Sequence, residues 1–596
     1  MWNIKKHMQK KTQFSSAYVF SNKGFSFVEL IITVAIFALV FGGLFAAFQS
    51  MIILISNSKA KAGALALMSS KMEYIRSLPY NDIGTIGGVP SGPIAQTSTT
   101  TINNIKYNER VLIQYVDDPA DGIGAADSNA ILADYKQVKV EYTWNVRGKL
   151  KKAALVSNIV PVGIESTAGG GTIRVNVFDA DANPVDAAEV RFVNNTTTTT
   201  IDTLRYTDSS GIAYLSAAPA AANYEITVTK SGYSTDKTYT ATTSNPNPVT
   251  PPAAVLESQI STMNFQIDEL SNLLIRTIGP ATYDTFTDTF TDSSLIATTS
   301  STTIGAGAMV LTGTGGIYAT SGTVQATSTS PATIDSWYSF SFDASTTAST
   351  SVKVSLLYNN GGVMMLVPDA DLPGNSVGFV NSPINITYLN PATYNELALK
   401  ATLDTLDTTE SPELHQWGLK YITNQPTIAN VDLSMQGAKV IGTDASSKPI
   451  YKFKETGTTN ASGQWSHNNI EWDTYTVEVA STGYSVYEVC PSSPYMLNPA
   501  ASTTMDITID TPATHLLRVI VTDTTNNPIA DATVRLQNIG VDELSSTSLC
   551  GQTYFSDGSL YDDDDYLLTV SAPGYTTQSL ASTTVSSSST VTVILN

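Results

Sequence analysis

The chain has 596 residues, more than the roughly 250 to 300 at which a single hydrophobic core stops growing, so several domains are expected. Charged residues make up only 14% of the chain, and its formal net charge is −20. Because this charge repels phosphate backbones and anionic lipid headgroups, it argues against nucleic acid as a partner.

The N-terminal region combines positive charge with a long apolar run. From Phe25 to Ile55 the sequence is apolar apart from Glu29 and a few small polar residues, and it exceeds the roughly 20 residues that a helix needs to cross a bilayer. By the positive-inside rule the N-terminus stays in the cytoplasm and the remainder lies outside, which predicts a single-pass membrane precursor. The lysines that precede the run are Lys5, Lys6, Lys10, Lys11 and Lys23.

The candidate cleavage site lies before this run, between Gly24 and Phe25, whereas an ordinary secretory signal is cut after its apolar core. The segment KGFSFVELI, residues 23–31, resembles the signal of bacterial type IV prepilins and of the related type II secretion pseudopilins. The resemblance implies that a membrane-embedded prepilin peptidase cleaves after Gly24 and methylates the new amine of Phe25. It also implies that Glu29 supports docking of one subunit on another.

Glu29 has a physical role beside that resemblance. A carboxylate in lipid costs several kcal/mol unless it finds a partner, so an intramembrane acid is a functional residue by default. The natural partner is the Phe25 amine of a neighbouring subunit, and the pair penalises any register that leaves either charge alone. The alternative is an acid that reaches the interface by snorkelling.

Beyond the membrane the helix is predicted to continue to Leu78, because apolar residues recur at helical spacing until Pro79. Many type IV pilins carry a proline near the twenty-second mature position, where this sequence has Ala46, preceded by Gly42 and Gly43. Glycine would permit local unwinding there.

A small β-rich head is predicted after the helix. Residues 107–116 and 135–146 alternate as strands do, and the second is followed by a basic turn at 147–152 and another strand. This arrangement resembles minor pilins and pseudopilins more than major ones. Glycines at 169–171 then break the chain.

An internal repeat follows. VFDADANPVDAAEVRF (177–192) and VTDTTNNPIADATVRL (521–536) align without a gap, and three strands end in Gly-Tyr at 232–233, 483–484 and 574–575. Each copy predicts a strand, an Asn-Pro turn, a strand, a turn at Gly211, Gly463 or Gly558, and a further strand. The copies resemble the carboxypeptidase regulatory-like domain, a transthyretin-type β-sandwich without chemistry of its own; the middle copy lacks the Asn-Pro turn.

A further β-rich block lies between the first and second copies. It resembles jelly-roll sandwiches of the carbohydrate-binding-module type. Two interpretations of its aromatic residues stay open: a platform on which a sugar stacks, or the core of the sandwich. The residues are Trp337, Tyr338, Tyr358 and Trp417.

Cys490 and Cys550 are the two cysteines, and both lie in the exported part, where a disulfide persists. We expect them to pair and to join two neighbouring modules; the alternative is two inert thiols. The acidic run at 562–565 suits calcium, but four consecutive acids point in alternate directions on a strand, which favours a solvated hairpin tip.

No metal site, cofactor or catalytic residue is predicted. The four histidines are scattered and no metal-ligand spacing, nucleophile elbow or phosphate loop is present in the sequence. The chain is therefore predicted not to be an enzyme.

The predicted fold is an α+β pilin followed by a string of all-β sandwich modules. Its parts are a leader (1–24), a membrane and assembly helix (25–80), a head (81–168), a regulatory-like sandwich (172–278), a jelly roll (279–423) and two more regulatory-like sandwiches (425–510 and 511–596).

The predicted function is that of a minor type IV pilin-like subunit that anchors a stalk in a pilus, at its tip, for display or adhesion. Its expected partners are prepilin peptidase, other pilin subunits, the inner membrane before assembly, and a surface glycan or other cell-surface ligand. A secretion pseudopilin and a non-polymerising tethered surface protein remain alternatives.

Overall fold

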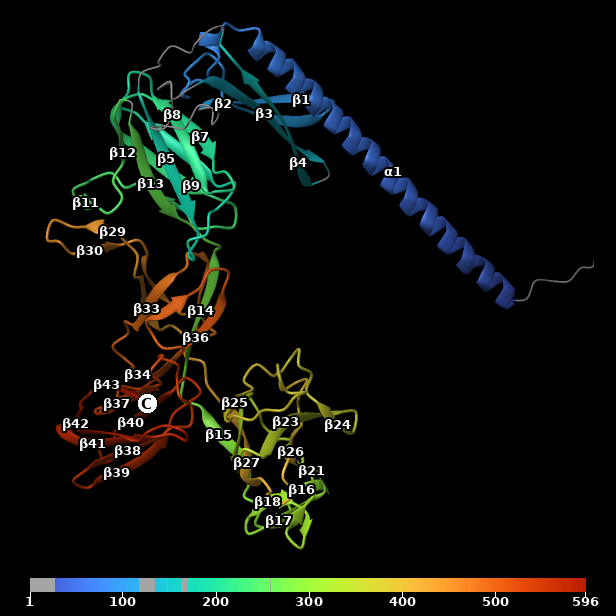
Figure 1. Cartoon of the computed structure of the whole chain (residues 1–596), viewed down its shortest axis with the longest axis vertical. Helices are drawn as coiled ribbons and strands as arrows, with labels where there is room; N and C mark the ends of the chain where they lie inside the picture. Colours follow the sequence, from blue (N-terminus) through green and yellow to red (C-terminus); the bar gives the residue numbers. More distant parts are fainter. Residues whose placement is uncertain (1–26, 117–133, 147, 162–169, 258) are drawn as a thin grey trace, which may run out of the picture.

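The computed structural model describes residues 27–116, 134–146, 148–161, 170–257 and 259–596. A long helix leads into a small head, from which β-sandwiches follow one another down the molecule (Figure 1). At the end far from the head two sandwiches lie side by side. The predicted order of a pilin-like helix and head followed by sandwiches is confirmed.

The helix α1 (Phe27–Arg76) runs unbroken for 50 residues, or about 75 Å at 1.5 Å per residue. Glycine therefore does not interrupt it at Gly42 or Gly43, where α1 has no neighbouring atoms within 4 Å of an added Cβ. Pro79 follows the helix and precedes the short 3-10 helix η1 (Tyr80–Asp82), as the sequence predicts.

The head is one antiparallel sheet in the order β1-β2-β3-β4. Every second residue of β3 is buried, and this face packs against the second half of α1. Met68, Met72 and Ile75 of the helix share a core there with Val138 and Val140. This packing explains the alternation in the sequence. The strands are β1 (Thr97–Ile102), β2 (Ile105–Val116), β3 (Tyr135–Val146) and β4 (Lys149–Ile159).

Module 1, residues 171–267, is a two-sheet sandwich. One sheet has the order β13-β5-β8; the other has the order β10-β9-β6-β7, with β12 also paired to β9. Its strands are β5 (Gly171–Phe178), β6 (Glu189–Asn194), β7 (Ile201–Tyr206), β8 (Ile212–Ala218), β9 (Ala221–Thr229), β10 (Asp236–Lys237), β12 (Ala253–Val255) and β13 (Ile260–Gln266).

The head is docked on module 1 through a shared core. Val89 of the head packs in the core of module 1, and the buried guanidinium of Arg205 donates to the carbonyl oxygen of Val89 at 2.6 Å. Burial lowers the pKa of Arg205 to about 9. Arg110 of the head pairs with Glu189 of module 1 at 3.2 Å.

Module 2 is discontinuous, which corrects the predicted boundaries 172–278 and 425–510. Its first strand, β14 (Ser271–Ile278), precedes the jelly roll in the chain but pairs with β32 and, in parallel, with β36, both of which follow it. The sheets are β32-β14-β36-β34 and β31-β28-β33-β35. The other strands are β28 (Asp432–Gly437), β31 (Lys454–Thr458), β32 (Gln464–Ile470), β33 (Asp473–Val479), β34 (Ser485–Cys490), β35 (Tyr495–Leu497) and β36 (Ser502–Asp510).

The jelly roll occupies the place of the missing Asn-Pro turn. In modules 1 and 3 that turn is closed by a bond from the amide of Asp179 to the oxygen of Asn183, and from Asp523 to Asn527, each at 2.9 Å. In module 2 the equivalent bond runs from the amide of Gly279 to the oxygen of Pro426 at 2.7 Å. The chain thus leaves module 2, forms a domain of about 145 residues and returns, at the place where modules 1 and 3 have a short turn.

The jelly roll, residues 280–424, has two sheets around one core. Their orders are β17-β18-β27-β22-β25, with β15 also paired to β27, and β16-β21-β26-β23-β24; β19 and β20 form a separate hairpin. The strands are β15 (Thr282–Asp288), β16 (Ile296–Ser300), β17 (Thr302–Gly305), β18 (Ala308–Leu311), β19 (Gly313–Thr314), β20 (Ile317–Tyr318), β21 (Ser321–Ala326), β22 (Ser336–Ser345), β23 (Thr350–Asn360), β24 (Val363–Leu366), β25 (Ile384–Asn385), β26 (Leu397–Thr405) and β27 (Glu413–Asn424).

Module 3, residues 515–595, repeats the arrangement of module 1, with sheets β40-β37-β43 and β39-β38-β41-β42. A turn lies at Gly558 as predicted, but it is not the equivalent of the turn at Gly211. That equivalent is Gly551, because Gly211 and Gly551 both have positive φ and their oxygens accept the amide of the first strand, from Val177 and Val521. The strands are β37 (Leu516–Thr522), β38 (Thr533–Asn538), β39 (Val541–Ser546), β40 (Gln552–Ser556), β41 (Asp563–Ser571), β42 (Gln578–Val585) and β43 (Ser589–Ile594).

Modules 1 and 2 are joined by a small intermodule sheet. β11 (Asn247–Pro248) of module 1 pairs with β29 (Val440–Thr443) of module 2, which forms a hairpin with β30 (Pro449–Tyr451). Beside it the ammonium of Lys452 donates to the oxygen of Thr235 at 2.9 Å and pairs with Glu471 at 2.7 Å. The joint therefore has backbone and ionic contacts as well as a covalent link.

Candidate functional sites on the helix and at the module junction

The predicted processing residues lie at the start of the chain. Gly24 and Phe25 lie outside the described residues. Glu29 lies within α1, and only its helical backbone is described. The cleavage, methylation and docking roles of these residues stay predictions.

The surface of α1 divides the helix into two parts. In the described part of its first half, large apolar side chains are exposed on every side, with Phe37, Leu39 and Phe45 as examples. An apolar stretch long enough to cross a membrane lies in this half, and none of it is buried within the chain. Such a surface requires either lipid or other subunits around it.

The second half of α1 is fixed to the head by polar contacts as well as by its apolar core. The hydroxyl of Tyr107 donates to the carbonyl oxygen of Ala60 at 2.9 Å, and Gly63 makes room for this ring, since an added Cβ would lie 2.7 Å from the hydroxyl oxygen. Lys71 pairs with the buried Glu109 at 3.1 Å. The head and this half of the helix therefore form one unit.

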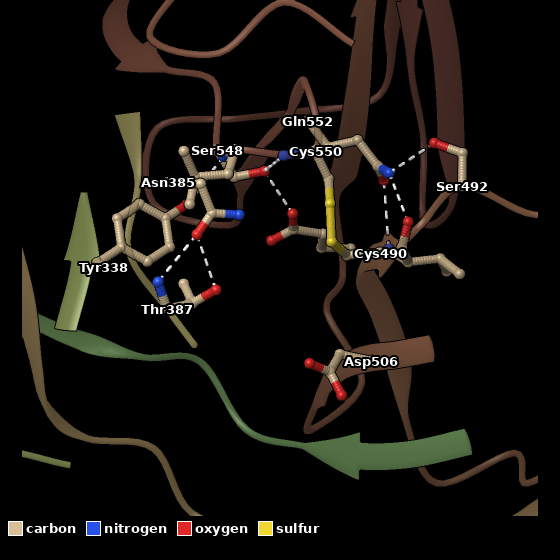
Figure 2. The surroundings of a disulfide bond; sticks show 12 residues. Tyr338, Asn385, Thr387, Cys490, Ser492, Asp506, Ser548, Cys550 and Gln552 are labelled. Carbon is tan, nitrogen blue, oxygen red and sulfur yellow. Dashed lines mark hydrogen bonds between the residues drawn. A yellow bond between two sulfur atoms is a disulfide. The ribbon is translucent and has the colours of Figure 1, made fainter. Parts of the chain in front are cut away.

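Cys490 and Cys550 are joined in a disulfide, with their Cα atoms 5.7 Å apart (Figure 2). Cys490 ends β34 of module 2, and Cys550 lies directly before Gly551 in the turn of module 3. The bridge therefore joins two neighbouring modules.

Gln552 reinforces the same joint. Its side-chain amide donates to the carbonyl oxygen of Val489 at 2.6 Å and to the hydroxyl of Ser492 at 2.9 Å, while its oxygen accepts the amide of Val489 at 3.3 Å (Figure 2). The rings of Tyr487 and Tyr554 pack edge to face, with their centres 4.6 Å apart. Modules 2 and 3 are thus held together by a disulfide, by the hydrogen bonds of Gln552 and by an aromatic pair.

A buried carboxyl lies next to the disulfide. The hydroxyl of Ser548 donates to Glu488, and burial raises the pKa of Glu488 although Arg518 and Lys420 oppose the shift. Burial also lowers the pKa of Arg518. The junction therefore opposes ionisation of Glu488 more than an exposed position would.

The stacking-platform hypothesis is wrong for the aromatic residues named above. Trp337 and Trp417 are fully buried in the core of the jelly roll, and the indole of Trp337 donates to the oxygen of Tyr394 at 2.6 Å. Tyr338 is buried at the junction, where its hydroxyl accepts the amide of Leu549 at 2.9 Å. Tyr358 is partly buried and packs edge to face on Tyr394. Trp337 and Trp417 thus point into the core, as the core interpretation requires, whereas Tyr338, the neighbour of Trp337 on β22, contacts module 3.

The acidic run begins a strand and is no hairpin tip. β41 starts at Asp563 after the chain crosses from one sheet of module 3 to the other. Asp563 accepts the amides of Asp564 and Asp565 and the side-chain amide of Asn538 at 3.1 Å. The described histidines, His415, His467 and His515, belong to different sandwiches and do not form a common site.

Comparison with known proteins identifies the N-terminal segment. Residues 20–45 match the prokaryotic N-terminal methylation motif. The chain carries a prepilin-type methylation motif. With the structure, this confirms a type IV pilin-like N-terminus followed by β-sandwich modules.

The modular remainder has distant structural matches and no match among curated proteins. The TIE protein of Bacillus anthracis is 9% identical, with 84% of this chain and 73% of that chain covered and a TM-score of 0.15. BcpA, the major pilin subunit of Bacillus cereus, is 10% identical over 72% and 99% of the two chains, with a TM-score of 0.14. RrgB, a pilus protein of Streptococcus pneumoniae, is 10% identical over 72% and 98%, with a TM-score of 0.12. At these TM-scores the overall shapes differ, and the similarity carries nothing about function.

Sequence reasoning missed most of the junction. Glu488, Gln552 and Tyr338 come from three different parts of the chain and share no motif. The usable signals were the two cysteines, which mark the joint, and the missing Asn-Pro turn of the middle copy, which marks the insertion.

Proposed function

We propose that the chain is a minor type IV pilin-like subunit that carries its β-sandwiches outside the cell for adhesion or display. The precursor is held in the inner membrane by α1, prepilin peptidase cleaves it after Gly24 and methylates Phe25, and Glu29 then guides it into a filament. The observation that carries this proposal is the methylation motif at residues 20–45 at the head of an exposed apolar helix.

The two-part surface of α1 supports assembly. A helix that is apolar all round is stable only when it is surrounded by lipid or by other helices. Its second half is already packed on the head, so the first half is the part that is free to exchange lipid for neighbouring subunits.

The size of the modules supports a minor position at the tip or at low density. Four sandwiches extend from one head, and the furthest pair lies well away from α1 (Figure 1). Subunits that each carried this bulk would crowd one another along a closely packed shaft. A single copy at a tip, or a few copies among smaller subunits, avoids the collision.

Incorporation into sheared filaments tests the role of Glu29. Glu29→Ala should leave cleavage after Gly24 intact but reduce the amount of the chain in the sheared filament fraction at least tenfold. The reason is that the variant loses the charge pair between Glu29 and the Phe25 amine of a neighbouring subunit. Glu73→Ala is the matched control, since Glu73 lies exposed on the same helix and pairs with Arg76 of the next turn. Equal incorporation of both variants would refute the docking role.

Immunogold labelling of module 3 separates the possible positions. Label confined to filament ends or to sparse points along the shaft supports the proposal. Dense label along the shaft refutes a minor role, label confined to the periplasm favours a secretion pseudopilin, and surface label that never shears off favours a tethered protein.

A further inference from the structure

A groove of about 1120 Å³ lies between the jelly roll and module 3. Its floor is formed by strands β15, β22 and β27 of the jelly roll. Its opposite wall is formed by residues 528–531 and 572–575 of module 3, which are the Asn-Pro turn and the Gly-Tyr segment of the repeat.

Contacts between the jelly roll and module 3 hold the two sides of this groove in place. The hydroxyl of Tyr338 in the jelly roll accepts the amide of Leu549 in module 3. Within the jelly roll, the ammonium of Lys420 lies 4.3 Å from the ring centre of Tyr283 and 5.0 Å from that of Tyr338, which orders the side chains at this contact. Module 3 is also bridged to module 2, from which the jelly roll emerges. The groove is therefore preformed, as small-ligand sites usually are.

Short hydroxyl and amide side chains line the floor. They are Thr285, Thr287, Ser339, Ser341 and Gln416. The backbones beneath them are already paired, since β27 bonds to β22 on one side and to β15 on the other. The floor thus offers side-chain donors and acceptors in a row, and β15, which pairs only with β27 among the described strands, forms its edge.

Tyr575 on the wall differs from its counterparts in the repeat. Tyr233 packs on the core of module 1 and Tyr484 on the core of module 2, whereas Tyr575 is 38% exposed and lines the groove. Phe342 of the jelly roll lines the same groove. An aromatic face beside a hydroxyl-rich floor matches a pyranose, which has an apolar face and a rim of hydroxyls.

We propose that this groove binds a neutral oligosaccharide, with the ring of Tyr575 stacked on a sugar and the floor bonded to its hydroxyls. This proposal rests on the proposed display function and supplies its ligand class. The charged residues in the groove are Asp343, Asp531 and Lys420, and with a chain charge of −20 they disfavour an acidic sugar.

Binding of the full-length chain in detergent micelles to an array of neutral and acidic oligosaccharides tests the proposal. Neutral members should bind, and the best of them is then titrated by calorimetry. Tyr575→Ala should weaken its affinity at least tenfold, while Tyr575→Phe should stay within threefold because the ring remains. Tyr388→Ala removes an exposed tyrosine of the jelly roll outside the groove and should change nothing. Thermal unfolding checks that each variant is folded.

Several results would overturn the groove assignment: no binding to any oligosaccharide, binding to acidic members alone, equal loss in the Tyr575 and Tyr388 alanine variants, or competition by an extended peptide. Filament incorporation is scored separately. A chain that binds sugar through Tyr575 but never enters sheared filaments refutes the pilus role and supports the groove.

Discussion

Replacing both cysteines with serine tests how the far modules are held together. The bridge joins residues 60 positions apart, which corresponds to about 4 kcal/mol at 25 °C in the chain-entropy description of a cross-link. The loop runs from the end of β34 through β36 and into the turn before β40, so it spans the boundary of modules 2 and 3. Gln552 and the Tyr487–Tyr554 pair remain in the variant and should keep the modules docked in dilute buffer.

Urea unfolding followed by circular dichroism measures this loss. With a slope of about 2 kcal/mol per molar, the midpoint for these modules should fall by about 2 M in the Cys490→Ser, Cys550→Ser variant. A reducing agent should lower the midpoint of the unmodified protein similarly and leave the double variant unchanged. A loss below about 1 kcal/mol, or two alkylatable thiols in unreduced protein, would refute the reasoning.

Three further predictions follow from the corrected module boundaries and the junction. A fragment of residues 425–596 should fail to fold module 2, because β32 and β36 lose the strand β14 that lies between them; restoring 271–278 through a short turn in place of the jelly roll should recover it, as the fluorescence of module 2 tryptophans would report. Gly551→Ala should lower the free energy of unfolding by more than Gly558→Ala, because its Cβ would lie 2.5 Å from a carbonyl oxygen whereas the nearest atom at Gly558 is 4.0 Å away; equal losses in urea titrations would contradict this. Because the folded pKa of Glu488 is raised above its ordinary 4.5, stability should fall as the pH rises through the window above 4.5, and Glu488→Gln should remove that slope in thermal scans; an unchanged slope would show that another group titrates.

The sequence predicted the elements whose signal is local. The length of α1 and its end before Pro79, the alternation of β2 and β3, and the strands on either side of the Asn-Pro turns in modules 1 and 3 all follow from periodicity and turn residues. The inward or outward direction of an aromatic ring was less certain, because Trp337 and Trp417 lie on strands whose register only the folded sheet fixes.

Long-range pairing was beyond the sequence. β14 has buried residues at Leu273 and Ile275 and would suit either neighbouring sandwich, so nothing local assigns it to strands that follow some 190 to 230 residues later. The Gly551 turn was misplaced for a simpler reason. Gly558 also has positive φ and lies in a turn, but it does not accept the amide of the first strand.

The insertion of the jelly roll determines how the protein responds to tension. A pull on the jelly roll reaches the membrane helix covalently through β14, which enters module 2 at Ser271 and leaves it at Ile278. Both ends of β14 lie on this path, so its backbone carries the tension and its hydrogen bonds to β32 and β36 are not pulled apart. Module 1 differs, since it is entered through β5 and left through β13, and these parallel paired strands are drawn past each other along their length, which loads their hydrogen bonds together. A tether of this design resists shear while module 3 and the rest of module 2 stay outside the covalent path of the load.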